Sequence, residues 1–276
     1  MPAILAYDFM RRAFIVGILL AVIVPCIGII VVLKRLSMLG DALSHTSLAG
    51  VAAGLILGIN PILGAVTACV AAALSIEAIR KRIPKFSEMS IAIIMSAGIG
   101  LAGVLSGFVK SAANFNSFLF GSIVAIDDFE MLLVACISFA VMLAFMLLYK
   151  ELFYIAFDER GARLAGIPVR TVNFIFTILT AATVSVAART VGALIVSSLM
   201  VIPVACAMQF GRSYKQTVLY SVCFAMLFTV LGLFLSYYGG LRPGGTIVLI
   251  GVVCLLLIFL YKKCRCHAAT NREQAR

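Results

Sequence analysis

Two residues of this sequence could bind a metal ion together, because Asp41 and His45 lie four positions apart within an otherwise apolar stretch. On an α-helix this spacing places both side chains on one face, about one turn apart. Ionisable side chains are costly in an apolar setting such as a membrane, so a pair of them there indicates a functional site. A carboxylate and an imidazole are suitable ligands for a divalent ion such as zinc or manganese.

Each of these residues also has a purely structural explanation. Asp41 could cap the start of a helix, and His45 could hydrogen-bond to a neighbouring helix. His45 is, however, the one histidine outside the C-terminal tail, and it falls beside the one aspartate embedded in an apolar run. This coincidence favours the metal-site hypothesis.

Two side chains do not complete the coordination shell of a metal ion. Two copies of the chain about a two-fold axis would bring together two Asp41 and two His45, and so supply four protein ligands. If the ion is transported, a modest site of this kind suits it better than a closed shell of thiolates, because the ion must also be released. The pair therefore points to a homodimer in which zinc or manganese is cargo and no cofactor is permanently bound.

The composition indicates that membrane-spanning helices position this pair. Hydrophobic residues make up 63% of the 276 positions and charged residues 12%, against roughly half and a quarter in a soluble domain. A spanning helix needs about 20 apolar residues. A shorter, more polar segment at 41–58 holds Asp41 and His45, and eight segments reach the full length: about 13–33, 61–79, 90–109, 130–149, 171–188, 191–210, 216–237 and 244–261. We expect a single all-α domain over residues 1–276, a polytopic bundle with eight or nine spans.

The basic residues indicate how these helices are oriented. The net charge is +11, and the Lys and Arg residues cluster at the ends of apolar segments, as the positive-inside rule describes. The sequence has no basic face interleaved with aromatic residues, so it does not indicate nucleic-acid binding. The segment 110–129, with Asp127 and Asp128, is expected outside, and four segments are expected in the cytoplasm: 80–85, 159–170, 212–215 and the basic tail 262–276.

The N-terminal segment 1–12 does not fit this rule. Three full spans before residue 80 would put Arg11 and Arg12 outside while Lys34 and Arg35 lie inside. Either the rule is locally violated or segment 41–58 does not fully cross. The side of the N-terminus therefore stays open.

Two further features bear on function. No Gly-x-x-x-x-Gly-Lys-Ser/Thr phosphate loop occurs, so this chain cannot bind ATP by that route. Cys264, Cys266 and His267 lie together in the tail, but without a fourth ligand they make a weak metal site.

The segment from Lys34 to Val51 resembles the signature of the zinc/manganese class of ABC importer permeases. A basic pair, Lys34-Arg35, and the core Gly40-Asp41-Ala42-Leu43-Ser44-His45 precede a helix of small residues. Shorter matches extend the resemblance over most of the chain: Phe118–Ile123, Phe157-Asp158 followed by Ala162 and Gly166, and Val191–Leu194 running to Ile202-Pro203.

The resemblance implies a type II ABC importer-like permease in the bacterial plasma membrane. Such a permease pairs with a second copy, two cytoplasmic ATP-binding subunits and an extracytoplasmic metal-binding protein, so ATP hydrolysis belongs to a partner and the chain is not itself an enzyme. The resemblance also implies a short cytoplasmic coupling helix, for which residues 158–170 are suited because Asp158, Ala162 and Gly166 have the family's spacing.

Two other functions fit parts of the sequence. A proton-coupled secondary metal transporter would use Asp41 and His45 to relay protons as well as to bind the ion, and would need no ATPase. A membrane-embedded metalloprotease would use Asp41 and His45 around zinc, but the sequence has no His-Glu-x-x-His motif and no convincing general base. Asp41 and His45 suit zinc, manganese and ferrous iron alike, so the identity of the metal stays open.

Overall fold

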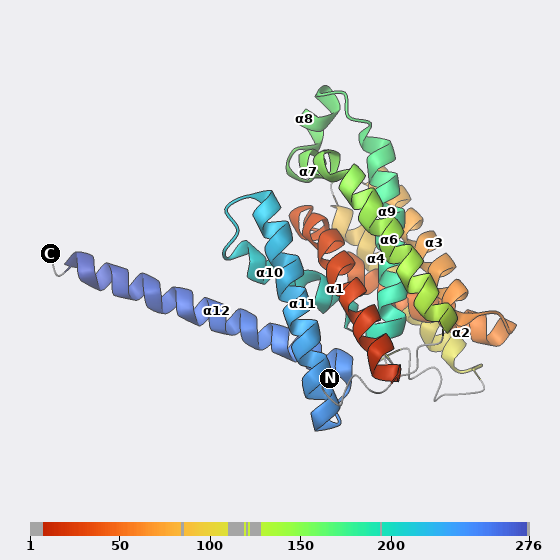
Figure 1. Ribbon diagram of the computed structural model, residues 1–276. Coiled ribbons are helices and arrows are strands. Elements are labelled where there is room, and N and C mark those ends of the chain that lie inside the picture. Colours follow the sequence, from red (N-terminus) through yellow and green to blue (C-terminus); the bar gives the residue numbers. More distant parts are fainter. Residues whose placement is uncertain are drawn as a thin grey trace.

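The structure is a computed structural model that describes residues 8–83, 86–109, 119, 121, 128–193 and 195–274. The elements in these ranges are all helical, and most of them run side by side between the two ends of a bundle (Figure 1). Four helices are short or partly polar: α2 (Leu39–Leu57), α7 (Tyr149–Phe157), α8 (Glu159–Leu164) and α10 (Val196–Met208). Seven are long and apolar enough to cross a membrane: α1 (Asp8–Leu33), α3 (Pro61–Arg82), α4 (Ser87–Ser106), α6 (Asp128–Leu147), α9 (Val169–Ala187) continued by the π-helix η4 (Ala188–Gly192), α11 (Tyr214–Gly239) and α12 (Pro243–Gln274).

The expected count of eight or nine spans is therefore too high for the described part of the chain. Segment 41–58 does form a helix, α2, but the polar residues of its first half keep it out of the apolar set. Segment 191–210 is divided, because η4 ends at Gly192 with φ +112° and α10 begins at Val196. At 13 residues α10 is about 20 Å long, against a hydrocarbon core of about 30 Å.

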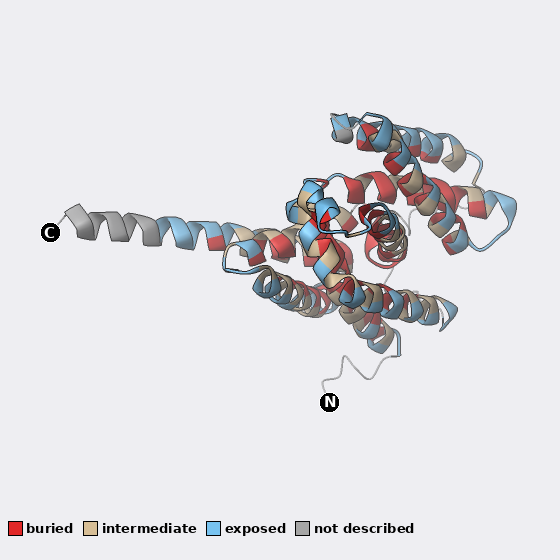
Figure 2. Cartoon of the chain, turned by 90° about the horizontal axis from the view of Figure 1, so that it is seen from above, coloured by how far each residue is buried: buried red, intermediate tan, exposed pale blue. Residues whose placement is uncertain are grey.

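Buried residues lie on the sides of the helices that are turned toward the centre of the bundle, and exposed residues lie on the outer sides (Figure 2). The centre contains apolar residues such as Ile27 and Leu43, which are fully buried. The outer surface is also apolar in places, with Phe139 72% and Leu249 66% exposed. Lipid tails, not water, are the suitable surroundings for such side chains.

Close backbone contacts hold α2 inside the bundle. A Cβ atom added to Gly50 of α2 would lie 2.3 Å from the carbonyl oxygen of Gly64 in α3, and one added to Gly64 would lie 2.4 Å from that of Gly50. On another side of α2, a Cβ on Gly98 of α4 would lie 2.7 Å from Thr46 Oγ1. Helices approach this closely where small residues meet, and the contacts fix the rotation of α2.

Helix α1 runs from one end of the bundle to the other. Near its start, Arg12 forms an ion pair of 2.8 Å with Asp128, the first residue of α6. Just after its end, the Lys34 ammonium donates a hydrogen bond of 2.6 Å to Asn173 Oδ1, near the start of α9. Arg12 and Lys34 therefore lie at opposite ends of the bundle. Each of the two N-terminal arginines is paired with a carboxylate, because Arg11 also pairs with Asp8, at 3.2 Å.

Candidate functional site

Asp41 and His45 lie in the first half of α2, and both side chains are partly exposed. Gly40 faces α10, where a Cβ would lie 3.3 Å from Ser197, and Thr46 faces α4 through Gly98. At 100° per residue, Asp41 and His45 point into the sector between those two neighbours. Neither side chain makes a hydrogen bond or ion pair with a residue that the structure describes. The pair thus faces an incompletely packed side of α2.

The structural explanation of Asp41 as a helix cap is wrong. The N-cap of α2 is Met38, which makes no side-chain capping bond, and Asp41 is already the third residue of the helix. A carboxylate in the first turn lies where the helix dipole favours negative charge. A partly buried acid without a hydrogen-bond partner is unusual in a purely structural role.

The described part of the chain gathers no further metal-binding side chains around Asp41 and His45. Among the described residues, no group of three or more His, Cys, Asp and Glu side chains gathers in positions that could hold a metal ion. The tail residues Cys266 and His267 lie where side chains are not described, and Cys264 is exposed. In the described part of the chain, no third side chain of this kind joins Asp41 and His45, and their role as metal ligands stays a prediction.

Ser44 is a further candidate for this site, although no sequence pattern singles it out. Its side chain is 1% exposed, and its Oγ atom has no hydrogen-bond partner in the described part of the chain. Buried hydroxyls are rarely left without a partner. Ser44 lies directly before His45, on the adjoining face of α2.

Residues 158–166 form the short helix α8 and its two ends. Asp158 is the N-cap, and its carboxylate accepts a hydrogen bond of 3.0 Å from the Arg160 backbone N–H. Gly161 leaves room for that carboxylate, since a Cβ there would lie 2.5 Å from Asp158 Oδ2. Gly166, just beyond the helix, has φ +82°, which favours glycine. Asp158 and Gly166 therefore set the two ends of α8.

Ala162 is buried within its own chain at 2% exposure. Its small size therefore serves the packing of α8 against the bundle, and a bulky replacement would displace this helix. The role of Asp158, Ala162 and Gly166 in coupling to an ATPase stays a prediction.

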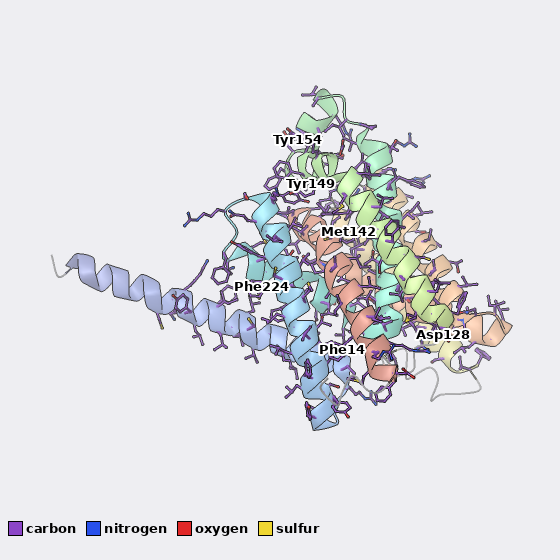
Figure 3. All side chains as sticks on the ribbon, viewed as in Figure 1. Phe14, Asp128, Met142, Tyr149, Tyr154 and Phe224 are labelled. Atoms are coloured by element: carbon purple, nitrogen blue, oxygen red, sulfur yellow. The ribbon has the colours of Figure 1, made fainter. Side chains whose placement is uncertain are left out.

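An exposed apolar surface surrounds α8. Leu164 is 91% exposed, Phe157 64% and Tyr154 56%. Tyr154 lies at the end of the bundle formed by α7 and α8, far from Asp128 at the opposite end (Figure 3). Exposed apolar patches of this kind mark places where a protein contacts another protein or the membrane. No local sequence pattern indicates this surface, because its exposure depends on how α8 projects from the bundle.

Two of the matched sequence segments meet in space. A Cβ on Gly121 would lie 2.3 Å from the Val191 carbonyl oxygen, and one on Gly244 would lie 2.2 Å from the same atom. Val191 belongs to the π-helix η4, a form that occurs often at functional sites. Phe118, Phe120, Ser122, Ile123 and Leu194 of those segments lie outside the described residues, as do 110–117, 124–127 and 84–85 of the predicted loops.

Another residue of η4 forms a largely buried ion pair with α6. Arg189 Nε and Nη2 both lie 3.0 Å from Glu130 Oε1, and the two side chains are 14% and 15% exposed. This pair ties η4 to the first turn of α6.

Apolar spans around an embedded polar helix, with an exposed apolar surface at one end, define a multi-pass membrane protein with the architecture of a transport subunit. The model of the ABC 3 transport family matches residues 6–262, and the chain belongs to this family. The resemblance drawn from Lys34–Val51 is thereby confirmed, as are the all-α fold and the bacterial plasma membrane location.

Relatives cover nearly the full length of the chain. It is 35% identical to the "Probable metal transport system membrane protein" of Treponema pallidum, over 92% of this chain and 96% of that protein. Identity is 29% to the manganese transport system membrane protein MntC of Listeria innocua (95% and 93% covered) and 27% to the zinc uptake protein ZnuB of Haemophilus influenzae (93% and 98% covered). The solved structure of PsaBC from Streptococcus pneumoniae in complex with Fab superposes with a TM-score of 0.82 at 30% identity, covering 92% and 91%.

Proposed function

We propose that this chain is the membrane-spanning permease of an ATP-driven importer for manganese or zinc, in which Asp41 and His45 bind the ion in transit. The observation that carries the proposal is the pair itself. It lies on a polar helix inside an apolar bundle, it faces an incompletely packed side of α2, and neither residue has a described partner. The relatives that carry manganese and zinc in their names support both metals.

A second copy of the chain completes the site in this proposal. Two Asp41 and two His45 offer four ligands, and two carboxylates balance the two positive charges of the ion. A neutral assembly lowers the cost of holding an ion among apolar helices. Mixed carboxylate and imidazole ligands also bind less tightly than a thiolate cage, so the ion can be released.

The ATPase partners in this proposal dock on the α8 surface. Leu164 projects almost fully exposed from a helix whose two ends are set by Asp158 and Gly166. One ATP-binding subunit per copy of the chain would cover this apolar surface on the cytoplasmic side. An extracytoplasmic metal-binding protein would deliver the ion at the end that bears Asp128.

Reconstitution tests the proposal. The chain and a candidate ATPase partner are placed together in liposomes, and uptake of radioactive manganese and zinc is followed with ATP, without ATP and with a pH gradient alone. ATP-dependent uptake is expected, whereas uptake driven by the pH gradient without the ATPase would support the proton-coupled alternative. The variant His45→Ala should lose zinc uptake more than manganese uptake, because imidazole suits zinc better.

A further inference from the structure

A cleft of about 920 Å³ opens at the end of the bundle that bears α8, and the proposed metal route does not use it. Its walls are the last turn of α3, the helix α8 and the first turn of α9. Six of its lining side chains are charged, four basic and two acidic: Arg80, Lys81, Arg163, Arg170, Glu77 and Glu159. The cleft therefore has an excess of positive charge.

Both carboxylates of the cleft are already paired within the protein. Glu77 lies 2.6 Å from Arg80 and 3.5 Å from Lys81, and Glu159 lies 2.6 Å from Arg163. No acidic group of the lining is left to balance further positive charge.

The excess charge centres on the start of α9. Arg170 is exposed and has no hydrogen-bond or ion-pair partner in the described parts of the chain. Asn173, one turn away, also lines the cleft, and its Oδ1 atom accepts the hydrogen bond from Lys34 Nζ. An anion in the cleft would thus meet one unpaired guanidinium and a second cation behind Asn173.

The position of the cleft along the membrane normal identifies the kind of anion. The span of α3 ends at Arg82 and the span of α9 begins at Val169, so both helices leave the membrane at the cleft. Span ends mark the boundary between hydrocarbon and headgroups. One turn into the membrane from Arg170, on the same face of α9, Phe174 is 45% exposed. The positive charge of Arg170 therefore lies at the depth of the lipid headgroups, and the apolar surface at Phe174 lies at the depth of the acyl chains.

We propose that this cleft binds one anionic phospholipid, with its phosphate at Arg170 and Lys81 and its acyl chains along the Phe174 side of α9. Basic pockets between spanning helices on the cytoplasmic side bind such headgroups, and guanidinium groups pair well with phosphate oxygens. Glu159 and Arg163 of α8 form one wall. A bound lipid therefore contacts the helix on which the ATPase would dock, and holds it against the bundle.

Lipid binding is measured on the purified full-length chain by native mass spectrometry, with phosphatidylglycerol or phosphatidylcholine added. The parent should retain one phosphatidylglycerol in preference to phosphatidylcholine. The double variant Lys81→Gln, Arg170→Gln leaves Glu77 paired with Arg80, and should bind phosphatidylglycerol about tenfold more weakly, a loss of about 1.4 kcal/mol.

A matched control removes two positive charges at the same end of the bundle but outside the cleft. Arg212 and Lys215 adjoin Tyr214, whose ring packs at 5.1 Å against Tyr149 of α7. The variant Arg212→Gln, Lys215→Gln should keep the parental lipid preference. Because the test reads lipid binding by the chain alone, its outcome does not depend on metal transport.

Four results would overturn the proposal. A parent that does not prefer phosphatidylglycerol has no such site. If both double variants bind phosphatidylglycerol equally weakly, the lipid is attracted by the overall positive charge of this end of the bundle and not by the cleft. Inorganic phosphate that displaces the lipid at millimolar concentration would identify a free-anion site. Loss of ATPase co-purification by the cleft variant, with lipid binding intact, would assign the cleft to an acidic surface of that partner.

Discussion

The ammonium of Lys34 donates a hydrogen bond of 2.6 Å to Asn173 Oδ1 and lies 5.2 Å from the centre of the Phe176 ring. This contact joins the end of α1 to the first turns of α9, at the end of the bundle where the proposed lipid cleft and coupling helix lie.

The contact predicts a pH dependence of stability. Burial, and to a lesser extent the charge of Arg80, lowers the pKa of Lys34 to about 8 from 10.5. Between pH 8 and 10.5 the unfolded chain therefore keeps a proton that the folded chain has lost, so stability rises with pH across this window. Thermal midpoints in detergent should show this rise in the parent, and it should be smaller in Lys34→Met. Parallel pH curves for the two proteins would contradict the assignment.

The approach of Gly50 and Gly64 predicts that α2 tolerates no side chain at this crossing. Gly64→Ala places a Cβ 2.4 Å from a backbone carbonyl oxygen, and overpacking of this kind costs about 1–3 kcal/mol. Gly100→Ala is the matched control, because no atom lies within 4 Å of its added Cβ and alanine favours helix. Thermal melts should show a lower midpoint for the first variant alone; equal midpoints would show that α2 and α3 do not meet here.

The exposure of Leu164 predicts that it contacts the ATPase. Leu164→Asp should reduce co-purification of the ATPase at least tenfold while the permease stays folded, because the charge would be buried on docking. Leu241→Asp is the control, since Leu241 is also exposed, at 56%, but at the opposite end of α11 from Tyr214. If both variants retain the partner, α8 is not the docking element.

The ion pair between Arg12 and Asp128 predicts that the start of α1 shares a membrane side with the start of α6, which is the external side if the basic loops are cytoplasmic. In a background without the exposed Cys136, Cys223 and Cys264, an impermeant thiol reagent on intact cells should label Arg11→Cys and spare Arg163→Cys. The reverse pattern would invert the topology.

The sequence predicted the helices and the placement of Asp41 and His45 on one helix, because both depend on local features, apolar length and helical spacing. It did not predict that segment 191–210 is divided, since that depends on the positive φ of Gly192 within a π-helical segment. The ion pair between Arg12 and Asp128 joins residues far apart in the chain, so no local pattern signals it. Charge counting alone treated both arginines as unbalanced, and this left the N-terminal side open.

The exposure of Leu164 and the incomplete packing beside Asp41 could likewise not be predicted from the sequence. Each depends on how several helices pack around one residue. Ser44 differs, because it lies within the predicted site, but only its burial without a partner sets it apart from the other hydroxyls of α2.

Metal uptake by the Asp41→Asn variant tests the central claim most directly. Asparagine keeps the shape of the side chain but removes the charge that offsets the ion's desolvation, so uptake per folded permease should fall at least a hundredfold for both manganese and zinc, about 2.7 kcal/mol or more. Asn60→Asp, which retains the N-cap at α3, serves as a control for folding and membrane insertion, because either residue can cap a helix. Uptake by Asp41→Asn close to that of the parent, at equal amounts of folded protein, would contradict the account and remove Asp41 from the metal route.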